Sequence, residues 1–322
     1  MNNLFFKNLD LNYENLPQYK NIKKKLSNKI VLGILVSLKI FWVFIRQLKY
    51  DPKGFFKTLL MIKKFENPNK NTLEVDGYDL FKISSKNLKL IKQILLDLNY
   101  EYKQNSKIDN VNEFCDTTFK LSESKFKEIK KIMMSDDQFI SALKAVSYYK
   151  NLKKIPSINH ITLQQISASD GYAKKRVLSC EKFPCEYMHR DTVIGQIKIL
   201  MYLTDVKDDE NGATGICKKS HLNGIPSFNC YVGGAIDNLG LFKRDEKTKI
   251  KFLSLPKIFQ IKSDFGSDIP KNSRLSDFLL ASEDKILGAA GTIIVFDPLG
   301  IHRGGIVRKG RRDTLQISLS IK

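Results

Sequence analysis

The spacing of apolar residues changes once along the chain, near Pro156. Before this point, apolar side chains recur every three or four residues, as on one face of a helix. This spacing predicts helices over residues 85–98, 124–134 and 137–149. After it, short segments alternate between apolar and polar residues, which predicts strands over residues 161–166, 192–204 and 314–321. The pattern therefore predicts a helical support region, residues 67–156, followed by a strand-rich core, residues 157–322.

Two short polar segments fit between these elements. Residues 135–137 (SDD) separate two predicted helices and carry side chains that cap a helix N-terminus. Residues 208–212 (DDENG) predict a turn, because Asn211 and Gly212 tolerate a positive φ angle. Both segments are therefore expected to mark boundaries between regular elements.

A long irregular insertion, residues 223–285, interrupts the predicted strands. Loops of this length in a compact domain are often functional lids, and this one has enough apolar residues to fold over a site. We expect residues 253–261 and 278–280 to line an apolar substrate pocket. The sequence of the insertion does not identify the substrate.

The N-terminal segment, residues 1–66, is basic and apolar. Residues 30–45 (IVLGILVSLKIFWVFI) form a nearly continuous apolar run, interrupted by Lys39, with basic residues on both sides. The run is shorter than the roughly 20 residues of a spanning helix, and it lacks the cleavage site of a secretory signal. Two interpretations stay open. Residues 30–65 either lie on an anionic membrane surface, with Trp42 among them, or form a buried helix whose lysines extend outward.

Composition narrows the class of protein. At 322 residues the chain can hold one large domain or two. Its five cysteines are odd in number and include no C-x-x-C pair, so we expect no disulfide framework or zinc site and favour a cytoplasmic location. The net charge of +20 favours acidic partners such as anionic lipid or acyl-CoA. The charge is diffuse rather than gathered in a basic stripe, so no specific nucleic-acid partner is expected.

Candidate chemistry lies in two separate segments. His189 and Asp191 form a His-x-Asp triplet, and His302 follows 111 residues later (302 − 191 = 111). On a strand, residues i and i+2 point to the same face, so the histidine and the aspartate can reach one ion. Two imidazoles and one carboxylate form the facial triad that holds non-heme Fe(II) and leaves positions open. The third ligand must then arrive on a neighbouring or facing strand, as it does in a jelly roll.

Three segments carry a family resemblance: the HRD triplet, residues 199–221 (ILMYLTDVKDDENGATGICKKSH) and residues 291–305 (GTIIVFDPLGIHRGG). Over about residues 158–322, the chain resembles the phytanoyl-CoA dioxygenase-like family. The resemblance implies an Fe(II)- and 2-oxoglutarate-dependent oxygenase that also consumes O2. It implies an α+β fold, in which a double-stranded β-helix (a cupin-like jelly roll) is the core and the helical N-terminal part packs outside.

The resemblance also assigns roles to individual residues. Three of them match the iron ligands of the family: His189, Asp191 and His302. Relatives that halogenate have a small residue in place of the aspartate, which frees a coordination position for chloride. Because this chain retains Asp191, hydroxylation or another oxidation is favoured over halogenation.

A basic residue follows the second metal-binding segment. Arg312 matches the arginine that anchors the distal carboxylate of 2-oxoglutarate, which a guanidinium binds through a two-pronged, charge-assisted fork. Arg311 is the alternative, but strand alternation puts Arg312 on the face of Thr314. Lys198 is a further candidate for contact with the co-substrate, and for His221 we expect a hydrogen bond that fixes a loop.

Three functions remain open from the sequence. The first is a hydroxylase that acts on an aliphatic C–H bond of an acyl, lipid, glycan or small-metabolite substrate. The second is an oxidative demethylase of nucleic acid, which the diffuse charge disfavours. The third is a non-catalytic metal-binding β-barrel, in which Arg312 would be dispensable. We favour the hydroxylase because it accounts for the arginine as well as for the triad.

Overall fold

The computed structural model describes most of the helices and strands that the sequence predicts. The described residues are 29–50, 72–105, 118–167, 191, 197–223, 232, 235–236, 239, 254–256, 258–259, 280–298, 300–305 and 307–320. The helices are α1 (Lys29–Tyr50), α3 (Thr72–Asp76), α4 (Ser85–Asn105), α5 (Glu123–Met134) and α6 (Asp137–Lys150), with a 3-10 turn at Ser220–Asn223. The strands are β1 (Tyr78–Lys82), β2 (Thr118–Lys120), β3 (Ser157–Ser167), β4 (Lys198–Tyr202), β5 (Thr214–Cys217), β6 (Glu283–Ile286), β7 (Thr292–Phe296), β8 (His302–Arg303) and β9 (Arg311–Ser320).

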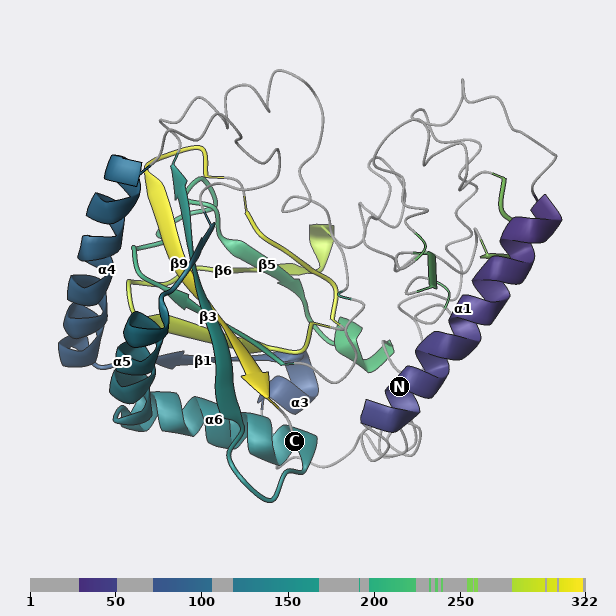
Figure 1. Ribbon diagram of the computed structural model, residues 1–322, viewed down its shortest axis with the longest axis horizontal. Coiled ribbons are helices and arrows are strands. Elements are labelled where there is room, and N and C mark those ends of the chain that lie inside the picture. Colours follow the sequence, from purple (N-terminus) through teal and green to yellow (C-terminus); the bar gives the residue numbers. More distant parts are fainter. Residues whose placement is uncertain are drawn as a thin grey trace.

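The described strands form two antiparallel sheets. One has six strands in the order β1-β7-β4-β9-β3-β2, and the other has three in the order β6-β5-β8. The helices α4, α5 and α6 lie along one side of the sheets, and α1 lies at the opposite end of the molecule (Figure 1). Antiparallel sheets with helices outside them agree with the predicted α+β class.

The two faces of the six-stranded sheet differ in chemistry. One face is apolar and packs on the helices through residues such as Leu315 and Ile317, which join Phe139 and Leu143 of α6 in one buried cluster. The other face meets the three-stranded sheet, where Tyr202 and Phe296 pack against Ala213, Ile216 and Ile286. Because β9 alternates, its polar residues point to this inner face: Arg312, Thr314, Gln316 and Ser318.

A partly buried polar contact helps to close the two sheets on each other. The Tyr78 hydroxyl of β1 donates a hydrogen bond to Asp284 Oδ2 of β6 at 2.6 Å, and Lys218 forms an ion pair with the same carboxylate at 2.8 Å. Burial and the bond to Asp284 raise the pKa of Tyr78 above its usual value. Burial alone would raise the pKa of Asp284, but the contacts with Lys218 and Tyr78 outweigh it and lower that pKa.

The helix boundaries follow the predicted capping chemistry. Asp136 caps α6, and its carboxylate accepts hydrogen bonds from Gln138 N and Phe139 N, both at 3.1 Å. The same side chain also accepts from Ser84 N at 3.0 Å and Asn87 Nδ2 at 2.9 Å. Asp136 therefore joins the start of α4 to the start of α6 and orients the helical layer on the sheet.

The helical interpretation of residues 67–156 missed two strands. β1 pairs with β7, and β2 pairs with β3, so both belong to the six-stranded sheet. They are short, with five and three residues, and the sequence signal of such strands is weak. The sheet therefore extends across the predicted boundary at residue 156.

The first helix matches the predicted apolar run but is mostly exposed. Val36 and Val43 are buried, whereas eight large apolar side chains of α1 are exposed. The burial expected for a core helix is therefore confined to one narrow stripe. No helix among the described residues is long and apolar enough to cross a membrane.

Candidate active site

Two of the three predicted metal ligands come together where the sheets meet. His302 opens β8 in the three-stranded sheet, and its buried ring meets Phe296 of β7 edge-on with a centroid distance of 5.0 Å. Asp191 lies upstream of β4, and its Oδ1 is 3.9 Å from His302 Nε2. His189, the third predicted ligand, lies outside the described residues. The structure thus juxtaposes one imidazole and one carboxylate from distant parts of the chain.

The ring of His302 is held in one orientation. Its Nδ1 lies 2.9 Å from the carbonyl oxygen of Gly300. A carbonyl oxygen only accepts, so this contact places the proton of the neutral ring on Nδ1. The lone pair then resides on Nε2, the nitrogen that points toward Asp191. Metal-binding histidines are typically oriented in this way.

A tight turn contacts both candidate ligands. The backbone N–H of Asp191 donates to Pro298 O at 2.9 Å, and His302 bonds to Gly300 O two residues further on. The turn is closed by Gly300 N, which donates to Asp297 O at 2.9 Å. Residues 297–300 therefore determine the relative position of the carboxylate and the imidazole.

The turn is itself anchored to the helical layer. The Asp297 side chain is buried and accepts a hydrogen bond from the Tyr149 hydroxyl of α6 at 2.7 Å. Lys150 Nζ lies 3.8 Å from the same carboxylate oxygen, and Asp297 N donates to Gly77 O at 2.9 Å. Helix α6 and the segment before β1 thus hold the turn from one side.

The Ser-His pair in the 3-10 turn supports it from another side. Ser220 Oγ accepts a hydrogen bond from Ile301 N at 2.7 Å and donates to Cys217 O at 2.6 Å. The buried His221 Nε2 lies 3.1 Å from Glu74 O. This contact fixes a loop, which is the role expected for His221 from the sequence.

β8 has only two residues, and an ion pair reinforces it. Arg303 donates two parallel hydrogen bonds to Glu283, each at 2.5 Å, across β5. Two-pronged pairs of this kind are the strong form of the interaction. The pair holds β8 to β6 and so fixes the backbone that carries His302.

Lys198, the further candidate for contact with the co-substrate, lies beside the candidate ligands. Its ammonium forms an ion pair with Asp191 Oδ2. In the sheet it is opposite Phe296 on one side and Ser318 on the other. Lys198 therefore brings a positive charge to the inner face at the level of the Asp191–His302 pair.

The two candidate arginines differ in their surroundings. Arg311 is partly exposed and pairs with Asp313 at 2.7 Å. Arg312 is buried on the inner face, and its guanidinium donates a hydrogen bond to Gly212 O. It is six residues before Ser318 (318 − 312 = 6), which is about 20 Å along β9. The backbone positions of Arg312 and Lys198 thus lie well apart along the strands of the inner face.

The spacing of the donor pair is close to that of two ligands on one divalent ion. Zinc, as an example, binds nitrogen and oxygen ligands at about 2.0–2.2 Å, so two donors of one ion lie about 3 Å apart when adjacent and at most about 4.2 Å apart when opposite. The 3.9 Å separation between His302 Nε2 and Asp191 Oδ1 lies between these two values. Within the described residues, no group of three or more His, Cys, Asp or Glu could hold a metal ion, and the candidate site needs His189 for its third ligand.

Sequence reasoning overlooked the residues that position the turn. Tyr149 was assigned only to a predicted helix, and Asp297 stood unremarked within the GTIIVFDPLGIHRGG segment. The sequence did carry a signal for Asp297, which lies directly after an apolar strand and before Pro298. An acidic side chain at such a position is costly to bury, so it is expected to have a hydrogen-bond or ion-pair partner. Its partner could not be found from the sequence, since Tyr149 lies 148 residues away.

Comparisons with known proteins give limited information. No family model matches the chain, and no curated protein matches it. Among solved structures, AviO1 from Streptomyces viridochromogenes Tue57 is 10% identical with a TM-score of 0.42, covering 78% of this chain and 92% of that chain. HygX from Streptomyces hygroscopicus, with nickel and 2-oxoglutarate bound, is 11% identical with a TM-score of 0.44, covering 77% and 84%. The non-heme alpha-ketoglutarate-dependent carbocyclase SnoK is 10% identical with a TM-score of 0.40, covering 77% and 81%. At these scores the likeness does not establish a shared activity, so the interpretation of the site rests on the residues of this chain.

Proposed function

We propose that this protein is a non-heme Fe(II)- and 2-oxoglutarate-dependent oxygenase that hydroxylates an aliphatic C–H bond. The observation that carries the proposal is the oriented pair of His302 and Asp191, whose donor atoms are 3.9 Å apart. His189, two residues before Asp191, completes the facial triad. When bound, Fe(II) together with 2-oxoglutarate and O2 supplies the oxidative chemistry.

The protein's own groups position the ligands and exclude water. The carbonyl of Gly300 keeps the proton of His302 on Nδ1, so Nε2 retains its lone pair for a metal ion. Pro298 O fixes the backbone of Asp191. Because the ring of His302 is buried against Phe296, solvent has little access to this ligand.

The inner face supplies the charge that an acidic co-substrate needs. Arg312 and Lys198 are both cationic, and polar side chains of β9 and β3 lie on the same face, including Gln316 and Gln164, which are hydrogen-bonded at 3.2 Å. A half-buried face of this kind requires polar occupants. A dicarboxylate bound at the Asp191–His302 pair satisfies it beside Lys198, and we assign the distal carboxylate to Arg312 by its position in the sequence. The buried guanidinium suits this role better than Arg311, which faces outward and binds Asp313.

The proposal also concerns the fold and the family of the protein. We propose that the two antiparallel sheets are the halves of a double-stranded β-helix, and that the chain is phytanoyl-CoA dioxygenase-like. The inner-face placement of β9 and the convergence of His302 and Asp191 from separate segments support this assignment. For the substrate we propose an acyl, lipid, glycan or small-metabolite molecule, taken up from a cytoplasmic location.

The test is an anaerobic titration of the Fe(II)-loaded protein with 2-oxoglutarate, monitored by the weak visible charge-transfer band. Wild type should develop the band. Arg312→Ala should bind iron normally but need far more 2-oxoglutarate, because truncating one partner of a buried charge pair costs about 2–5 kcal/mol. That cost corresponds to a dissociation constant raised roughly 30- to 5,000-fold.

The matched control is Arg311→Ala, which removes the neighbouring guanidinium from the outer face. It should leave the titration unchanged. His302→Gln and Asp191→Ala should each remove most of the iron affinity, whereas His160→Gln on β3 should leave it unchanged. Confirmed iron binding without any band in wild type would contradict the oxygenase and favour a metal-binding barrel. A normal band in Arg312→Ala would contradict the arginine assignment alone.

A further inference from the structure

The outward face of α1 is apolar along the whole helix. Eight large apolar residues are exposed by 44–78%: Ile30, Val31, Ile34, Leu35, Leu38, Phe41, Trp42 and Ile45. At about 100° per residue, they fall within an arc of about 140°. Val36 and Val43 are buried on the other side. This arrangement is the reverse of an ordinary surface helix, which turns its polar side outward.

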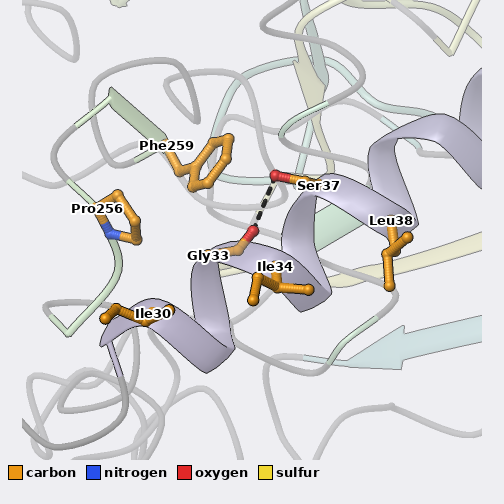
Figure 2. Close-up of a pocket in the computed structure, with 7 residues that line it drawn as sticks. All are labelled: Ile30, Gly33, Ile34, Ser37, Leu38, Pro256 and Phe259. Carbon is orange, nitrogen blue, oxygen red and sulfur yellow. Dashed lines mark hydrogen bonds between the residues drawn. The ribbon is translucent and has the colours of Figure 1, made fainter.

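A groove continues this face onto the body of the protein. It has a volume of about 460 Å³ and runs between α1 and the side chains of Pro256 and Phe259. Figure 2 shows Pro256 and Phe259 beside Gly33 and Ser37 of the helix, with Ile34 and Leu38 projecting from the same helix. Gly33 permits this approach, because an added Cβ would lie only 3.1 Å from Pro256 Cγ. The groove is lined by Ile30, Gly33, Ile34, Ser37, Leu38, Pro256 and Phe259.

The described residues that line the groove offer almost no polar partner to a ligand. Among them, the one polar side chain is Ser37, which donates its hydroxyl to Gly33 O at 2.9 Å within the same helix. The occupant of the groove and of the adjoining face is therefore expected to be apolar at the point of contact.

Positive charge borders the apolar face. Lys39 Nζ is 3.9 Å from the centre of the Trp42 ring, and Arg46 lies over the same ring at 5.2 Å. Both cations are at one edge of the apolar arc, and Lys49 lies in the last turn. In the sequence, residues 15–50 include eight lysines and arginines but no aspartate or glutamate. A helix with an apolar face, basic edges and an aromatic residue at the boundary is typical of attachment to an anionic lipid surface.

We propose that α1 docks this protein on the surface of an anionic phospholipid bilayer. The exposed apolar side chains enter the boundary between headgroups and acyl chains, and the groove beside Pro256 takes up apolar chain atoms. Lys39, Arg46 and Lys49 contact lipid phosphates and carboxylates. In this arrangement the helix lies in the plane of the surface.

The first experiment is co-sedimentation of the full-length protein with vesicles. Phosphatidylcholine vesicles are compared with vesicles that also contain phosphatidylserine, at low and high salt. The protein should bind the phosphatidylserine vesicles more tightly, and salt should weaken the binding. Leu38→Asp and Phe41→Asp should each weaken it more than about 10-fold. Lys39→Gln and Arg46→Gln should each weaken it roughly fivefold.

A matched substitution controls for a general loss of surface apolarity. Leu96→Asp on α4 changes a side chain that is 65% exposed, close to the 63% of Leu38, and should sediment like wild type. An equal loss of vesicle binding in Leu96→Asp and Leu38→Asp would overturn the proposal. So would wild-type binding that does not depend on phosphatidylserine. A smaller molecular mass for Leu38→Asp, with unchanged vesicle binding, would instead identify the face as a contact between two copies.

Trp42 allows a test that needs no variant. It is the sole tryptophan of the chain and lies on the exposed arc. Adding phosphatidylserine vesicles to wild type should shift its emission to shorter wavelength and protect it from acrylamide quenching. An unchanged spectrum and unchanged quenching would overturn the proposal, even if the aspartate variants fail to fold.

Discussion

The hydrogen bond between Tyr149 and Asp297 gives a sharp test of how the candidate site is built. The two side chains join α6 to the turn that contacts both Asp191 and His302. Tyr149→Phe removes one hydroxyl and leaves the packing of the ring intact. We predict that this small change at the helical layer weakens metal binding at a site that Tyr149 does not touch.

The magnitude follows from the contact. A hydrogen bond to a charged group contributes about 1.5–3 kcal/mol to stability. Asp297 is 4% exposed, so water cannot readily replace the lost donor, although Lys150 stays 3.8 Å away. We therefore expect unfolding to become easier by about 1.5–3 kcal/mol. Residues that support metal ligands typically change metal affinity by about 10- to 100-fold, and we expect a loss in this range.

Two measurements on the same samples test the prediction. Urea denaturation gives the free energy of unfolding, and anaerobic titration with Fe(II) gives the dissociation constant. The control is Tyr148→Phe, one residue earlier in α6 and 61% exposed, which should match wild type in both. Lower stability with unchanged metal affinity would refute the idea that the turn positions the ligands. No change in either quantity would show that the hydroxyl contributes nothing.

Two further predictions concern the scaffold. Asp136→Ala should lower the free energy of unfolding by about 2–4 kcal/mol in urea denaturation, because it removes a helix cap and leaves buried N–H donors without their acceptor. The neighbouring substitution Asp137→Ala should have little effect. Burial would raise the pKa of Asp136, but its hydrogen bonds outweigh burial and lower it. The stability that the ionised Asp136 contributes is therefore fully present above the ordinary aspartate pKa of about 3.9, and it is lost as the pH falls through the lowered pKa of the folded state. The difference in free energy of unfolding between wild type and Asp136→Ala should therefore narrow in acid. Gly77→Ala should lower the free energy of unfolding by about 1–3 kcal/mol in the same assay, since the φ angle of Gly77 is +89° and the new Cβ would lie 2.5 Å from His221 Nδ1. An unchanged free energy of unfolding would contradict this packing.

Local patterns determined much of the fold. The helices α5 and α6 match their predicted segments within one residue at each end, and α4 begins as predicted at Ser85 but continues past residue 98 to Asn105. Their apolar residues recur on one face, and the cap at Asp136 follows from its side-chain chemistry. The alternation in β9 correctly separated Arg312, which is buried, from Arg311, which is partly exposed. Such features depend on residues within a few positions of one another, so the sequence alone is sufficient to predict them.

Long-range contacts decided the rest. The strand β1 is short and carries a weak signal by itself, and its pairing with β7 is what makes it part of the sheet. The support of the candidate site by Tyr149 depends on a partner 148 residues away, and no periodicity in the sequence encodes that distance.

Helix α1 shows the same division between local and tertiary information. Its sequence predicted an apolar helix but left open whether the apolar residues were buried. Burial depends on which other surfaces of the chain pack against a helix, and this is a property of the whole fold. Only the tertiary structure showed that Val36 and Val43 face inward while the eight large apolar residues on the other side stay exposed.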